Sequence, residues 1–144
     1  MYTFNIEKLS YQQVFDLFIK YNDNFVPRLS DDVDIENYSK KVSDNALFAV
    51  YKNEDNIIGF VAYYLNLELS LVYITSVCVD FAFEGKGLAF ELISKLKKKY
   101  MSSIKIMALE VRKDNLKAFN LYNKLGFIIV EDRGDKWYMQ INFE

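Results

Sequence analysis

The chain has 144 residues, 51% of them hydrophobic, and a formal net charge of −2. This length predicts one compact domain over residues 1–144, and the weakly acidic charge gives no reason to expect a nucleic-acid partner. The chain contains no histidine, which excludes a Ser-His-Asp triad, a Cys-His nucleophile or a histidine-ligated metal within it, so we expect no metal cofactor.

The N-terminal part of the chain predicts a strand and two helices. Residues 2–10 alternate weakly between apolar and polar side chains, as strands do. Apolar residues then recur at helical spacing behind Ser10, which can cap the helix. The segment 22–41 holds the only proline and several Asp and Asn residues, which indicates a loop that enters a second short helix at about 34–44.

The segment from Ala46 to Phe81 predicts three consecutive strands that form a meander. Polar turns are expected at Asn53–Asn56 and near Glu68–Ser70. An apolar region, 57–83, is interrupted by polar residues and is rich in the Val, Ile, Tyr and Phe that favour strands. It therefore predicts buried strands rather than a membrane span, and we expect no membrane partner.

The second half of the chain predicts alternating helices and strands. The pattern indicates a helix at 86–100 with one apolar face, a strand at 103–111, a helix at 114–127 that ends at Gly126, and a hairpin at 127–143. Within the hairpin, Arg133-Gly134-Asp135 is interpreted as a turn without a partner, because its glycine supplies the positive φ that such turns need.

The only cysteine, Cys78, lies in an apolar run and cannot form a disulfide within the chain. No secretory leader is recognisable before the first predicted strand, so we expect a cytoplasmic protein. Aromatic residues make up 17% of the chain, which is compatible with a homodimer interface.

Two closely spaced glycines, Gly85 and Gly87, lie between the third strand and the next helix. Glycine tolerates unusual φ values, and the first N–H groups of a helix lack intrahelical partners, so such a turn can hold a phosphate. It is not a P-loop, because Leu88 follows Gly87, nor a dinucleotide fingerprint, because Phe90 stands at the third glycine position. On its own, the pair of glycines is a weak signal, and a purely structural role is the more common one for such a turn.

The segments "VCVDFAFEGKGLA" from Val77 and "LEVRKDNLKAFNLYNKLGF" at 109–127 together resemble the GCN5-related N-acetyltransferase (GNAT) family. In that family, a strand that ends in Val-x-Val leads into the motif Arg/Gln-x-x-Gly-x-Gly/Ala. A later helix carries an Asn, a Tyr seven residues further on, and then Leu-Gly-Phe, which here are Asn115, Tyr122 and 125–127. The resemblance implies an α/β (α+β type) single-domain GNAT fold with about four helices. Its mixed, mostly antiparallel sheet of six to seven strands would splay apart between Val79 and Val111.

The same resemblance implies that acetyl-coenzyme A (acetyl-CoA) lies in the splay as cosubstrate. The cofactor-binding residues it implies are Val77, Cys78 and Val79 for the pantetheine arm, Glu84, Gly85, Lys86, Gly87, Leu88 and Ala89 around the pyrophosphate, and Asn115 and Tyr122 from the later helix. Asn115 and Tyr122 are almost two helical turns apart and can address one ligand. Asn115 could equally be a helix cap, and Tyr122 a core aromatic.

Glu84 departs from the family pattern, which has Arg or Gln at this place. Its carboxylate would lie near the pyrophosphate, with Lys86 nearby to offset the charge. At about 8 Å in a water-like dielectric, two unit charges interact by roughly 0.5 kcal/mol, which is tolerable unless the site is dry. The departure keeps open a non-catalytic acyl-CoA-binding sensor or interaction module as an alternative function.

The resemblance implies an acyltransferase that moves an acetyl group to a primary amine by direct attack. We hypothesise that Tyr122 is the general acid for the leaving thiolate, because phenol and thiol have reference pKa values of about 10 and about 8.5. Glu110 is the candidate base, acting through water, since a glutamate matches this place in the branch that acetylates protein N-termini. A solvated or ion-paired side chain is the alternative for Glu110.

A small-molecule amine, either a metabolite amine or an amino sugar, is the expected acceptor, and a peptide or protein N-terminus is the alternative. Candidates for the acceptor pocket are Tyr63, Tyr64, Asn66 and Glu68, on the strand before the splay. Core or sheet-surface roles fit these four residues equally well. Acidic residues at 31–36 could also attract a cationic amine.

Overall fold

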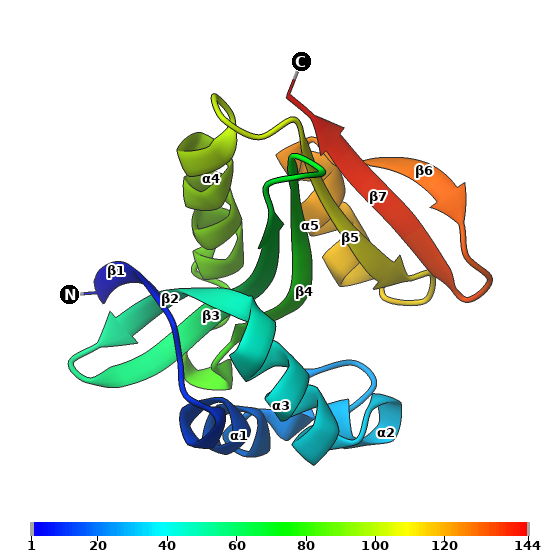
Figure 1. The fold of residues 1–144 in the computed structure, drawn as a ribbon. Helices are drawn as coiled ribbons and strands as arrows, with labels where there is room; N and C mark the ends of the chain where they lie inside the picture. The colour runs from blue at the N-terminus through cyan, green and yellow to red at the C-terminus, as the bar shows by residue number, and fades with distance from the viewer. Residues whose placement is uncertain (1, 144) are drawn as a thin grey trace.

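The computed structural model describes residues 2–143, which form one seven-stranded sheet with helices on both faces (Figure 1). The strands are β1 (Tyr2–Glu7), β2 (Ala46–Asn53), β3 (Asn56–Asn66), β4 (Leu71–Val79), β5 (Ile106–Arg112), β6 (Ile128–Asp132) and β7 (Lys136–Asn142). The helices are α1 (Tyr11–Lys20), α2 (Leu29–Asp32), α3 (Ile35–Asn45), α4 (Leu88–Tyr100) and α5 (Leu116–Leu125), with 3-10 turns η1 (Asn22–Asn24) and η2 (Phe81–Phe83).

The sheet has the strand order β1-β2-β3-β4-β5-β7-β6. Within residues 2–143, β4 and β5 are the only parallel neighbours, and the other pairs are antiparallel. This confirms the predicted α/β class with a mixed, mostly antiparallel sheet. The predicted strand meander and the C-terminal hairpin are both present.

The helices are short, and α4, the longest, has 13 residues. In the described part of the chain, no helix is both long enough and apolar enough to cross a bilayer. The segment 22–41, expected to be a loop before the second helix, also contains η1 and α2. These single turns are too short to show a helical period, and α2 is anchored by the buried side chain of Leu29.

Side chains cap three of the four longer helices. Ser10 accepts a hydrogen bond from the Gln13 N–H at the start of α1, Asp34 caps α3, and Asn115 caps α5. Such caps stabilise a helix by about 1 kcal/mol each because they satisfy N–H groups that lack intrahelical partners. The exception is α4, which follows Gly87 and has no side-chain cap.

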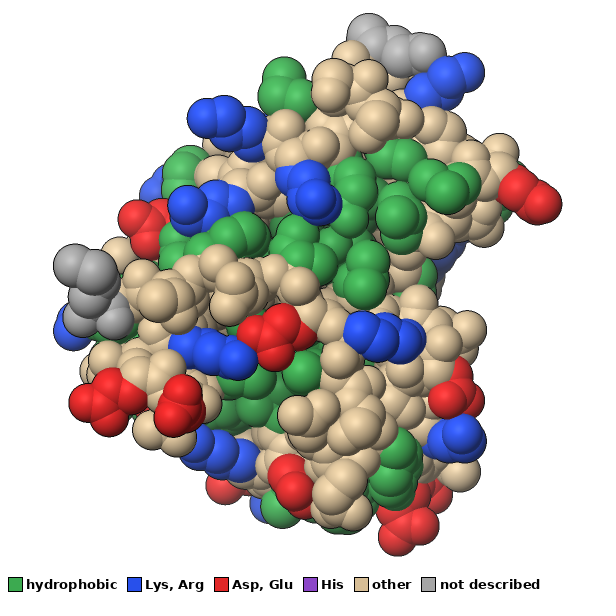
Figure 2. Space-filling model, turned by 60° about the vertical axis from the view of Figure 1, so that its left-hand side comes forward, with side chains coloured by type: hydrophobic (Ala, Val, Ile, Leu, Met, Phe, Trp, Pro, Cys, Tyr) green, Lys and Arg blue, Asp and Glu red, His purple; other side chains and the backbone are tan. Residues whose placement is uncertain are grey.

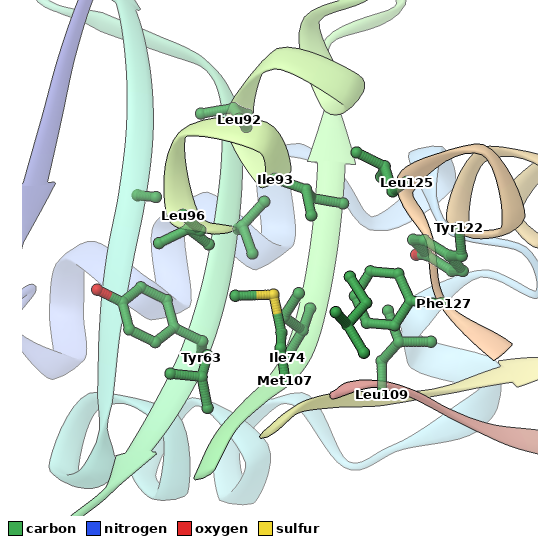
Figure 3. Close-up of a cluster of buried hydrophobic side chains, with 14 of the residues drawn as sticks. Tyr63, Ile74, Leu92, Ile93, Leu96, Met107, Leu109, Tyr122, Leu125 and Phe127 are labelled. Atoms are coloured by element: carbon green, nitrogen blue, oxygen red, sulfur yellow. The ribbon is translucent and has the colours of Figure 1, made fainter. Parts of the chain in front are cut away.

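The two faces of the sheet carry separate hydrophobic cores. On one face, Leu92 and Leu96 of α4 and Tyr122 of α5 pack in a single cluster with side chains of β3, β4 and β5 (Figure 3). On the other face, Phe18 of α1 and Val42 of α3 pack against β2 and β3. Full burial of each large apolar side chain contributes about 1.5–3 kcal/mol, so both layers hold the sheet in place.

Strands β4 and β5 pair only over Leu71–Ile74 and Ile106–Leu109, and they then diverge (Figure 1). Just beyond the last pair, the register with β3 skips Thr75, which forms a β-bulge. Within the described residues, the edge of β4 after the bulge has no strand partner on the β5 side. The predicted splay is therefore present, and it begins at the bulge.

The surface carries charges of both signs. Figure 2 shows one face on which basic and acidic side chains are interspersed around a band of hydrophobic ones. This distribution matches the small net charge of −2.

Candidate functional site

A cavity of about 880 Å³ opens where β4 and β5 diverge. Its walls come from the second half of β4, the turn before α4, the end of β5 and the first turns of α5. The segment between α1 and α3 covers one side. Elements far apart in the sequence thus meet around one space, whose size lies within the range of small-molecule sites.

The turn before α4 presents a run of unpaired backbone N–H groups to this cavity. Gly85 and Gly87 have φ values of +78° and +76°, in the left-handed region that favours glycine. Within residues 2–143, no N–H from Gly85 to Ala89 donates to a protein acceptor. A Cβ atom added at either glycine would meet nothing within 4 Å beyond its chain neighbours. The turn is therefore open, and its amides at the positive end of the α4 dipole suit an anion.

Asp80 organises the start of this turn, a role that the sequence analysis missed. Its Oδ1 accepts the Ala82 N–H at 2.9 Å, and its Oδ2 lies 2.9 Å from the Tyr21 hydroxyl. Burial, followed by the hydrogen bond to Asp80, raises the pKa of Tyr21 above its usual value. An aspartate directly after a buried strand is a recognisable capping signal, so this role could have been found.

Asn24 of η1 also escaped the sequence analysis. Its Nδ2 donates to the Val79 carbonyl at 2.8 Å, and the residue lines the cavity. This contact closes the far end of the open β4 edge, after Val77 and Cys78. It depends on tertiary packing, and no local pattern around Asn24 indicates it.

Tyr122 and Asn115 line the same cavity, as their helical spacing predicts. Tyr122 is 8% exposed, and its ring contacts Phe127 edge-on at 5.8 Å between centroids (Figure 3). Its hydroxyl has no hydrogen-bond partner in the described part of the chain, and burial raises the pKa of Tyr122 to about 12. The Asn115 side chain accepts the Ala118 N–H at 3.2 Å, so its capping role is real and coexists with its place in the cavity wall.

Cys78 lies in the cavity wall between Val77 and Val79. It is 4% exposed. Burial, with smaller contributions from Asp80 and Glu84, raises the pKa of the thiol to about 12. At neutral pH the reactive thiolate is therefore scarce, and Cys78 is unsuited to be a nucleophile.

The charges around the cavity differ from those expected. Glu84 lines it, but Lys86 does not, and the Lys86 ammonium lies 5.4 Å from the centroid of the Phe83 ring. Two other lysines, Lys117 and Lys136, do line the cavity, and neither forms an ion pair within residues 2–143. The positive charge in the cavity wall therefore comes from these two lysines and Arg112 rather than from Lys86.

Glu110 lines the cavity from β5, opposite the turn before α4. Its Oε2 accepts a hydrogen bond from Arg133 Nη1 at 3.2 Å, and its side chain is 29% exposed. Tyr73 of β4 lies beside it: burial, followed by the Glu110 charge, raises the pKa of Tyr73 above its usual value. The ion-paired state anticipated as an alternative is thus the one that the structure shows.

The four predicted acceptor residues do not reach this cavity. Tyr63 is fully buried in the core at the end far from Tyr122, and its hydroxyl lies 2.8 Å from that of Tyr100 (Figure 3). Tyr64, Asn66 and Glu68 line a separate, shallower pocket of about 620 Å³. They lie away from the splay because β4 stands between β3 and the diverging edge. On the side of this cavity away from α4, the structure brings together Tyr38, Tyr73, Glu110 and residues of the segment 23–33.

Solved structures with the same fold cover nearly the whole chain. PaiA N-acetyltransferase from Thermoplasma acidophilum, solved in complex with coenzyme A, is 17% identical over 97% of this chain and 99% of that chain, with a TM-score of 0.76. The ribosomal-protein-S18-alanine N-acetyltransferase from Escherichia coli is 17% identical over 98% and 94%, with a TM-score of 0.77. A chimera of spermidine N-acetyltransferase SpeG from Vibrio cholerae and hSSAT is 16% identical over 97% and 95%, with a TM-score of 0.75.

At these identities the three structures establish the fold alone. No curated protein matches the chain significantly. The model of the acetyltransferase (GNAT) family matches residues 11–127, from the start of α1 to the end of the Leu-Gly-Phe motif. Because that match spans most of the sequence, the chain belongs to the GNAT acetyltransferase family.

Proposed function

We propose that this protein is an N-acetyltransferase that moves an acetyl group from acetyl-CoA to a primary amine of a small molecule. The observation that carries the proposal is a single cavity with three features: the unpaired amides from Gly85 to Ala89, the free edge of β4 and the Tyr122 hydroxyl. The structure of PaiA N-acetyltransferase, which has the same fold, contains coenzyme A.

In this proposal the amides from Gly85 to Ala89 bind the pyrophosphate, because free N–H groups at a helix N-terminus favour anions. The backbone of Val77–Val79 pairs with the amides of the pantetheine arm, as a neighbouring strand would. Asn115 and Tyr122 flank the arm from α5. Lys117, one turn before Leu121 on the same helix, adds positive charge to this part of the cavity.

The reaction needs a neutral amine and a stabilised leaving thiolate. The amine nitrogen attacks the thioester carbon, the carbon–sulfur bond breaks, and the proton lost by the amine passes to water near Glu110. A phenol of pKa about 12 would give its proton to a thiolate of pKa about 8.5 only at a cost of about 5 kcal/mol. In this proposal Tyr122 therefore donates a hydrogen bond to the developing thiolate. It does not transfer its proton in the nearly balanced step that the reference pKa values of phenol and thiol suggest.

The acceptor class is tested by release of free thiol from acetyl-CoA in the presence of amines, amino sugars and peptides. A small amine as the best substrate supports the proposal. A peptide as the best substrate would favour the alternative function, acetylation of a peptide or protein N-terminus. The ribosomal-protein-S18-alanine N-acetyltransferase, which has the same fold, is named for such a substrate. Tight binding of coenzyme A in calorimetry, with no acceptor used, would identify a non-catalytic module instead.

Replacing Cys78 with alanine should leave kcat within about twofold of the wild-type value. A thiol of pKa about 12 is a poor nucleophile, so direct attack by the amine does not need it. Steady-state rates test this expectation, and intact-protein mass spectrometry after incubation with acetyl-CoA alone provides the control. An acetylated Cys78, together with an inactive variant, would show a covalent mechanism instead.

Replacing Glu84 with arginine should tighten coenzyme A binding about fivefold at low ionic strength. Removal of the Glu84 charge, about 8 Å from the pyrophosphate, should improve the binding free energy by roughly 0.5 kcal/mol. The attraction between the new arginine and the pyrophosphate should add about as much again. The gain should shrink as salt is added. Calorimetry measures both effects, and Glu68→Arg, in the separate pocket, is the matched control. Equal affinities for the two variants would show that Glu84 does not lie near the pyrophosphate.

A further inference from the structure

The turn between β6 and β7, residues 133–135, is fastened to β5 by two ion pairs. Arg133 Nη1 donates to Glu110 Oε2 at 3.2 Å, and Arg112 Nη1 donates to Asp135 Oδ2 at 3.4 Å. The Lys113 N–H also donates to the Asp135 carbonyl at 2.9 Å. These contacts within the chain join the predicted turn to the strand that supplies Glu110 to the cavity.

The guanidinium of Arg133 is itself held in place on two sides. Its Nε and Nη2 donate to the two carboxylate oxygens of Glu131 at 3.1 Å and 3.3 Å. Its central carbon lies 4.0 Å from the centroid of the Tyr138 ring. Tyr138 is the β7 residue directly opposite Glu110 in the sheet. The guanidinium is therefore pre-organised by its two hydrogen bonds to Glu131 and by the Tyr138 ring. Little further side-chain entropy is lost when its Nη1 bonds to Glu110.

We infer that Arg133 is a positioning residue for the acetyl transfer: it fixes Oε2 of Glu110, so that Oε1 is held toward the acceptor amine. This inference rests on the proposed function, because it assigns Glu110 to the acceptor side of the cavity. It adds a residue outside the cavity wall to the machinery. It also gives the hairpin turn a role beyond connecting two strands.

Several ionisable groups surround Glu110, and they show why Arg133 is the residue to replace. Arg133 faces it from the turn, Tyr73 from β4 and Tyr138 from β7. The other charged groups nearby are Glu131 on β6, Arg112 on β5, and Asp32 of α2 and Lys136 of β7 in the cavity wall. Arg133 is the one cation that directly contacts the Glu110 carboxylate in the described residues. Replacement of Arg133 therefore leaves Oε2 of Glu110 without a cationic partner.

Arg133→Met should lower kcat/KM by about tenfold, because the Glu110 carboxylate is then no longer held in one orientation, and Arg133→Lys should restore part of the loss. In a Glu110→Gln background, Arg133→Met should have no further effect on kcat/KM, since both changes act through one carboxylate.

Asp135→Asn is the matched control, because it breaks the neighbouring ion pair of the same turn without touching Glu110. It should change stability but leave kcat/KM unchanged. Denaturant unfolding reports the stability of each variant and is measurable even without turnover. A folded Arg133→Met variant that keeps the wild-type kcat/KM, or that lowers kcat/KM just as much in the Glu110→Gln background, overturns the inference. Failure of coenzyme A to bind in calorimetry would instead overturn the proposed function.

Discussion

Replacement of Tyr122 by phenylalanine should lower kcat by about 100-fold while leaving the affinity for coenzyme A almost unchanged. Removal of one hydrogen-bond donor to a developing negative charge costs typically about 10²–10³ in rate, and the phenylalanine keeps the ring that packs on Phe127. The lost hydroxyl has no hydrogen-bond partner within residues 2–143. The change should therefore cost little stability, and the loss should appear in the chemical step.

Tyr63→Phe is the control for this experiment. It removes a phenolic hydroxyl from the same core, but one that lies 2.8 Å from Tyr100 and far from the cavity. It should lower the free energy of unfolding by about 1 kcal/mol, the value of one buried hydrogen bond, and leave kcat unchanged. Steady-state kinetics, calorimetry and denaturant unfolding separate the two variants. A Tyr122→Phe enzyme with wild-type kcat would remove Tyr122 from the mechanism.

Replacement of Gly87 by valine should weaken coenzyme A binding by about tenfold or more. Gly87 has a φ of +76°, where a β-branched residue is strained by about 2 kcal/mol. The turn must then either keep this strain or rotate its amides away from the cavity. Both outcomes weaken a pyrophosphate site, and 1.4 kcal/mol already corresponds to a factor of ten in affinity.

Gly134→Val provides a closely matched comparison. Gly134 has a φ of +83°, and an added Cβ would have no neighbour within 4 Å there, as at Gly87. Both variants should lose similar stability in denaturant unfolding, whereas only Gly87→Val should lose affinity in calorimetry. If the two variants bound coenzyme A equally well, the amides before α4 could not be the pyrophosphate site.

The features that depend on local sequence were predictable. Apolar periodicity located the strands and the longer helices, and Ser10, Asp34 and Gly126 marked helix ends because capping depends on a few neighbouring residues. Gly85 and Gly87 were likewise recognisable as a turn with positive φ. The splay followed from the family resemblance, since nothing in the strand patterns alone indicates where two neighbours separate.

The features that depend on register and packing were not predictable. The bulge at Thr75 changes which face each later β4 residue occupies, so Ile74 and Val77 both join the α4 core although they are three residues apart. The contact of Arg133 with Glu110 and that of Asn24 with Val79 join residues 23 and 55 positions apart. No pattern within a short window encodes such pairs. This is also why the residues predicted on β3 and its turn line a different pocket from Glu110.

The hydrogen bonds of Tyr21 and Asn24 have a thermodynamic consequence. Tyr21 reaches Asp80 beside the glycine turn, and Asn24 reaches Val79 on the free β4 edge. One short segment, residues 21–24, is thus hydrogen-bonded both to the start of the glycine turn and to the free β4 edge. If the proposed function holds, linkage requires that any effect of a bound amine on coenzyme A affinity through this segment be matched by an equal effect of coenzyme A on the affinity for the amine.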